Sequence, residues 1–113
     1  MKFMKTVMLC ALTLSLPVVA SAGSATGTVT SLYADTAFGD LIYVELSGLK
    51  SNNPSCSTGK PPYQFVLPRT ATVYFDMLQL IELAQLNGQT VTVTGAGSCG
   101  VDFTVETVLS ITQ

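Results

Sequence analysis

The stretch 72-TVYFDMLQLIELAQLNGQTVTVTG-95 passes from the periodicity of a helix to that of a strand. Its first part predicts a helix over Thr72–Leu86, because apolar residues recur there at spacings of three and four. These residues are Tyr74, Met77, Leu78, Ile81 and Ala84. We expect Thr70 or Thr72 to cap this helix and Asn87-Gly88 to end it in a left-handed turn. Gln89–Thr94 then alternates threonine with valine, which predicts a strand.

Four more segments predict strands, since polar and apolar residues alternate along them. They are Thr26–Tyr33, Leu41–Leu46, Tyr63–Leu67 and Phe103–Ile111. With the helix they give the order β-β-β-α-β-β, which is typical of the OB-fold, a five-stranded barrel capped by its helix. We therefore predict a mainly β, OB-fold-like barrel. A small α+β roll with the same element order is the alternative, because strand pairing does not follow from one sequence.

A removable export signal is predicted for residues 1–22. Lys2 and Lys5 precede an apolar run over Thr6–Val19, and Ala20-Ser21-Ala22 offers small residues for cleavage before Gly23. The run is shorter than the ~20 residues that cross a bilayer, so we expect no membrane span after cleavage. The prediction is an exported protein, periplasmic or secreted, with a single domain over residues 23–113.

The cysteines agree with an oxidising compartment. Cys10 leaves with the signal, so Cys56 and Cys99 remain and are expected to form one disulfide. A structural metal site is the other use of two cysteines, but the chain has no histidine and no second cysteine pair to complete a ligand set. We expect neither a metal nor another cofactor.

Charge excludes two classes of partner. After cleavage three basic residues, Lys50, Lys60 and Arg69, stand against seven acidic ones, a net charge of −4. Nucleic acids and anionic membranes are bound by clustered lysine and arginine, which this domain lacks.

The sequence offers little catalytic machinery. It has no histidine base, and the carboxylate pairs Asp35/Asp40 and Asp102/Glu106 are interpreted as turn and strand-edge residues rather than as the acid and base of a glycosidase. The glycine-rich segment 95–100 is followed by a predicted strand, whereas phosphate loops lead into a helix. We predict that the protein is not an enzyme.

Three tyrosines are the candidate ligand contacts. Tyr33, Tyr43 and Tyr63 lie in or at the end of predicted strands, and the chain has no tryptophan. Aromatic faces beside polar groups suit the stacking of a sugar or a peptide. The alternative is ordinary packing within strands and core.

The element order, the signal peptide, the cysteine pair and the segment Leu83–Val93 resemble the B subunits of subtilase and pertussis-like AB5 toxins. This resemblance implies a secreted OB-fold that assembles into a ring, typically of five copies lined by their helices. It also implies binding of cell-surface glycans, often sialylated, to deliver a separate enzymatic chain. The sequence also resembles small uncharacterised exported proteins of Gram-negative bacteria, for which no activity is implied.

Two hypotheses follow. The first is a self-assembling exported domain that binds a carbohydrate through its tyrosines. The second is a monomeric periplasmic domain, such as an inhibitor or an envelope-stress factor, that binds another protein through a barrel face or through the loop Ser47–Pro62. A closed ring in solution favours the first, because multivalency raises glycan affinity.

Overall fold

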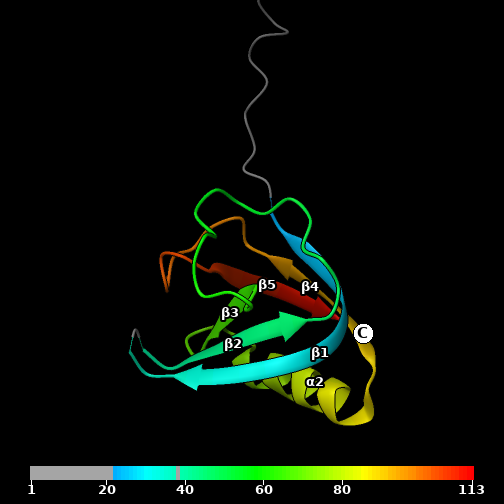
Figure 1. Cartoon of the computed structure of the whole chain (residues 1–113). Coiled ribbons are helices and arrows are strands. Elements are labelled where there is room, and N and C mark those ends of the chain that lie inside the picture. The colour runs from blue at the N-terminus through cyan, green and yellow to red at the C-terminus, as the bar shows by residue number, and fades with distance from the viewer. Residues whose placement is uncertain (1–21, 38) are drawn as a thin grey trace, which may run out of the picture.

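The computed structural model describes residues 22–37 and 39–113. The predicted signal peptide therefore lies outside the described residues, except for Ala22. The described part is mainly β, with five strands and one helix (Figure 1). In chain order these are β1 (Ser24–Asp35), β2 (Leu41–Leu46), β3 (Phe65–Pro68), α2 (Tyr74–Asn87), β4 (Thr90–Gly95) and β5 (Glu106–Thr112). The predicted element order is confirmed, and β2 has the predicted bounds.

The strand pairings run in a closed ring. Their order is β1-β2-β3-β5-β4, and β4 pairs again with β1, so the sheet is a closed barrel. The β3–β5 pair is parallel and the other four pairs are antiparallel. Strand β1 is long enough to serve two neighbours: Ser24–Thr28 pairs with β4, and Val29–Asp35 pairs with β2, with an irregularity between Val29 and Ser31.

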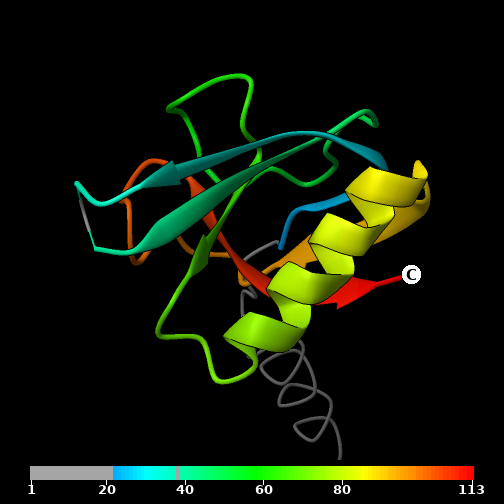
Figure 2. The same ribbon diagram turned by 90° about the horizontal axis from the view of Figure 1, so that it is seen from below.

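Helix α2 lies across one end of the barrel and supplies part of its core (Figures 1 and 2). Four of the five residues predicted for its apolar face are buried: Tyr74, Met77, Ile81 and Ala84. They pack in one cluster with inward-facing strand residues such as Val44, Phe65 and Val93. Within the described residues no helix is both long and apolar enough to cross a membrane.

Of the two predictions for the ends of α2, the one for its C-terminus is confirmed and the one for its N-terminus is wrong. Gly88 adopts the left-handed conformation, with φ of 65°, and its N–H bonds back into the last turn, as expected. The predicted threonine cap is wrong, because Val73 occupies the N-cap and no side chain bonds there. Backbone turns lead into the helix instead, through the bond from Tyr74 N–H to Ala71 C=O at 3.1 Å.

Two strands begin later than predicted. Strand β3 starts at Phe65 rather than Tyr63, because the Tyr63 N–H closes a turn onto Lys60 C=O at 2.9 Å. Strand β5 starts at Glu106 rather than Phe103, which has a φ of 73° and donates to Cys99 C=O in a turn. Polar and apolar residues continue to alternate through both turns, so the sequence pattern did not show where these strands begin.

Two loops, residues 47–64 and 96–105, lie on the side of the barrel away from α2 (Figure 1). The predicted disulfide joins them: Cys56 and Cys99 are bonded, with their Cα atoms 6.0 Å apart. Under the loops lies a second apolar cluster, outside the barrel core, made of Leu41, Tyr43, Val66 and Val105. The loops therefore cover one outer face of the sheet.

Candidate functional site

The three tyrosines chosen from the sequence come together on the covered face. Tyr33 from β1 stacks against Tyr43 from β2 and against Tyr63 from the 47–64 loop, with ring centroids 5.6 and 5.8 Å away. Tyr43 and Tyr63 are 6.0 Å apart. We call these three residues the tyrosine cluster.

The three rings differ in how far each is exposed to solvent. Tyr33 is 44% exposed, whereas Tyr43 is 0% exposed. Tyr63 is partly buried and its hydroxyl lies 3.3 Å from Ser31 Oγ. Lys60 and Tyr63 of the 47–64 loop lie against the Tyr43 ring and cover it, so a ligand contact is open to Tyr33 and Tyr63 and stays a prediction for all three. The Tyr43 ring packs against the rings of Tyr33 and Tyr63 and supports them.

Asp35 fixes the outer ring. The Tyr33 hydroxyl donates to Asp35 Oδ2 at 3.1 Å, and the Ala37 N–H donates to Oδ1 at 2.7 Å. These two hydrogen bonds hold the pKa of Asp35 below its ordinary value, and the same carboxylate raises the pKa of Tyr33. Tyr33 is therefore neutral and oriented, with an ionised carboxylate at its edge.

Asp102 anchors the buried ring. The Tyr43 hydroxyl donates to Asp102 Oδ2, and Oδ1 accepts from the N–H and the hydroxyl of Thr104. Burial raises the pKa of Asp102, but these hydrogen bonds and the charge of Lys60 outweigh it and lower the pKa. Lys60 Nζ also lies 5.5 Å from the centre of the Tyr43 ring. Both loops are thus tied to the tyrosine cluster.

A polar cavity of about 300 Å³ adjoins the cluster and shares Tyr63 with it. Its other walls belong to the 47–64 loop and include Asn53, Ser57, Lys50 and Gln64. Amide and hydroxyl groups beside an aromatic ring suit a ligand rich in hydroxyl groups. Tyr33 stacks on Tyr63, which lines this cavity, and we call Tyr33, Tyr63 and the cavity together the tyrosine surface.

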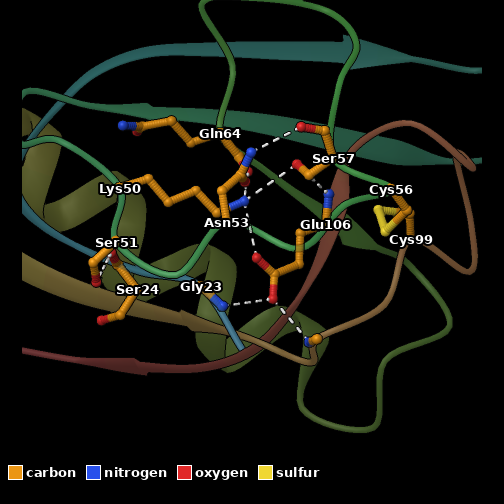
Figure 3. Close-up of polar contacts among 11 residues, drawn as sticks. Gly23, Ser24, Lys50, Ser51, Asn53, Cys56, Ser57, Gln64, Cys99 and Glu106 are labelled. Atoms are coloured by element: carbon orange, nitrogen blue, oxygen red, sulfur yellow. Dashed lines mark hydrogen bonds and ion pairs between the residues drawn. A yellow bond between two sulfur atoms is a disulfide. The ribbon is translucent and has the colours of Figure 1, made fainter. Parts of the chain in front are cut away.

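Lys50, in the wall of this cavity, belongs to a buried ion pair that the sequence did not reveal (Figure 3). Lys50 Nζ lies 2.9 Å from Glu106 Oε1, and the two side chains are 8% and 0% exposed. Lys50 also donates to Gln64 C=O at 2.9 Å and to Ser57 Oγ at 3.3 Å. Lys50 thus links the 47–64 loop to β5.

The carboxylates considered for catalysis do not meet. Asp102 bonds to Tyr43 and Thr104, whereas Glu106 bonds to Lys50 and to backbone N–H groups. Asp40 forms an exposed ion pair with Arg69 at 3.7 Å. Each carboxylate thus has a structural partner of its own.

Comparison with known proteins gives no relative: no protein-family model, no curated protein and no solved structure matches this chain.

Proposed function

We propose that the protein is an exported, non-enzymatic binding domain with an OB-fold, which takes a carbohydrate or glycoconjugate on the tyrosine surface. The closed ring of strands with a parallel β3–β5 pair, and a helix between β3 and β4, support the fold. The Cys56–Cys99 disulfide supports an oxidising compartment.

The main observation in favour of a carbohydrate ligand is the ordered, exposed ring of Tyr33. It is held from below by Tyr43, from the side by Tyr63 and at its hydroxyl by Asp35. A ring that is already ordered loses little entropy on binding, and the apolar face of a sugar stacks on such a ring. The Asp35 carboxylate then accepts hydrogen bonds from sugar hydroxyl groups at the edge of the Tyr33 ring.

A glycan array with neutral and sialylated glycans tests this proposal. We expect the unchanged protein to bind a defined set, and Tyr33→Ala to lose at least about tenfold in affinity, the cost of a stacked contact of roughly 1.4 kcal/mol. Phe103→Ala is the control, since Phe103 is an aromatic residue 71% exposed that lies outside both the tyrosine surface and α2. Equal loss in both variants, or no glycan bound by the unchanged protein, contradicts the proposal.

Self-assembly is part of the same proposal. Helix α2 exposes Phe75, Leu83 and Leu86, with Leu86 81% exposed, which supports contact between copies. Light scattering over a concentration series is expected to give the mass of a closed ring. Leu86→Glu is expected to reduce that mass to one chain.

The second candidate is a monomeric domain that binds another protein. It is favoured by Leu49, which is 94% exposed in the 47–64 loop beside the buried Lys50. An apolar residue presented by an anchored loop is suited to fill a pocket of a partner. A strict monomer at high concentration, together with no glycan binding, favours this candidate over the first.

A further inference from the structure

The beginning of β1 is held against Glu106 (Figure 3). The Gly23 backbone nitrogen donates to Glu106 Oε2 at 3.0 Å, and Gly23 is itself buried. Its carbonyl accepts from the Gly95 N–H at 2.8 Å. The next residue, Ser24, exchanges backbone hydrogen bonds of 3.0 and 2.8 Å with Ser51. The nitrogen of residue 23 is therefore positioned by β4, by the 47–64 loop and by β5.

A side chain at position 23 would force Glu106 and Lys50 to move. A Cβ atom there would lie 2.4 Å from Glu106 Oε1 and 2.4 Å from Lys50 Cε, well inside van der Waals contact. Gly95 is equally close, because a Cβ there would lie 2.1 Å from Glu106 Cδ. Two glycines thus make the space that the buried carboxylate occupies.

The carboxylate has unused capacity at this point. Oε2 accepts from the Gly23 and Gly97 N–H groups, at 3.0 and 2.8 Å. Oε1 is 2.9 Å from Lys50 Nζ, but this contact lacks hydrogen-bond geometry, so this buried oxygen has no hydrogen bond. A carboxylate accepts about four hydrogen bonds. An amide nitrogen supplies one proton, whereas an ammonium group supplies three and a positive charge.

The residue placed against this carboxylate is also the residue before which the sequence pattern predicts cleavage. We propose that cleavage before Gly23 creates a ligand for a site in the same chain: the new α-ammonium group of Gly23 pairs with Glu106 and locks β1 into the barrel. This inference rests on the export part of the proposed function. The uncleaved chain has only an amide N–H at this place.

The charged groups that face the Gly23 nitrogen are Glu106 and Lys50. The other groups around the site are neutral: the Gly95 and Gly97 backbone, the Ser57 hydroxyl and the Gln64 carbonyl. The Gly23 nitrogen is hydrogen-bonded to the Glu106 carboxylate, so pairing of an α-ammonium group there with Glu106 is expected to raise the pKa of the α-amino group above its ordinary ~7.7–8.0. The added stability is then present below the ordinary pKa and is lost as the pH rises through the raised one.

The test compares two chains exported by the same route. One is the unchanged full-length chain; the other has one serine inserted between Ala22 and Gly23, so that cleavage after Ala22 leaves an extra residue before Gly23. At pH 7 we expect the unchanged protein to unfold about 5 °C higher, a difference that vanishes above about pH 10. NMR titration of the Gly23 α-carbon in the unchanged protein is expected to give the raised pKa.

Intact mass separates this inference from the export proposal. A mature chain that begins at Gly23, with an ordinary α-amino pKa and equal unfolding temperatures, overturns the inference and leaves export standing. A chain that is not cleaved overturns both, and a chain that is cleaved elsewhere overturns the inference alone. The titration needs no substitution at Glu106, so a variant that fails to fold does not affect the outcome.

Discussion

Lys50 and Glu106 form an ion pair of 2.9 Å between the 47–64 loop and β5, with neither side chain more than 8% exposed. The pair is enclosed by Phe65, whose ring centre is 4.4 Å from Lys50 Nζ, and by the backbone at Gly23 and Gly97. Charges removed from water need a partner of opposite charge, because an unpaired buried charge is costly. The pair therefore holds together the first strand, the long loop and the last strand.

Lys50→Met is expected to destabilise the protein by about 3–5 kcal/mol, because it leaves the Glu106 carboxylate buried without its cation. Urea unfolding measures the loss. The control is Arg69→Met, which breaks the Asp40–Arg69 pair of 3.7 Å, with side chains 58% exposed, and is expected to cost less than about 1 kcal/mol. Similar small losses in both variants would show that the buried pair contributes little.

Gly95→Ala is expected to destabilise by at least about 2 kcal/mol, because the added methyl group would lie 2.1 Å from Glu106 Cδ in an already filled site. Gly100→Ala is the matched control, since a Cβ there meets nothing within 4 Å. We expect it to change the free energy of unfolding by less than about 0.5 kcal/mol. Thermal unfolding of both variants checks this, and an unchanged midpoint for Gly95→Ala contradicts it.

The double variant Cys56→Ser/Cys99→Ser is expected to lose about 4 kcal/mol, the chain-entropy value for the loop of 43 residues that the disulfide closes. Denaturant unfolding of the oxidised protein, the reduced protein and the variant is the measurement. The reduced protein and the variant should agree with each other. A midpoint equal to that of the oxidised protein in either one would exclude this role.

Tyr43 is expected to limit stability at alkaline pH. Burial and the hydrogen bond to Asp102 raise its pKa well above the ordinary 10. An acid whose pKa is raised by folding contributes stability below its unfolded pKa and loses it as the pH rises, so unfolding should become easier above about pH 10. Ultraviolet titration is expected to show one phenol that ionises only on unfolding.

Tyr43→Phe is the control for this measurement, because it keeps the ring and removes the titrating hydroxyl. The late-ionising phenol should then be absent. If it persists in the variant, another tyrosine is responsible and the assignment to Tyr43 is wrong.

The sequence predicted those features that depend on local pattern. The apolar face of α2, its end at Gly88 and the bounds of β2 follow from periodicity and from turn residues a few positions apart. The disulfide followed from counting, since only two cysteines remain after residue 22. The residues that determine α2 and β2 are neighbours in the chain. Cys56 and Cys99 have no other cysteine after residue 22 with which to pair.

The site was only partly predictable, because it depends on contacts between distant segments. Tyr33, Tyr43 and Tyr63 lie together, but the sequence did not show that Tyr43 is covered, because this depends on the path of the 47–64 loop. Nothing near Lys50 in the sequence indicates that its ammonium group meets a carboxylate on β5. Gly23 and Gly95 are the sequence features related to this ion pair, because they leave room for the Glu106 carboxylate. Their role becomes clear only once the position of Glu106 is known.

The position of β5 in the ring limits the order in which the strands can pair. The last strand in the sequence lies between β3 and β4, and it is the one that completes the ring. A growing chain that has reached Gly95 can pair β1 with β2, β3 with β2 and β4 with β1, but it leaves two unpaired edges. Closure waits for residues 106–112, so the ring is complete only once β5 can pair with β3 and β4, strands that lie far from it or next to it in the sequence.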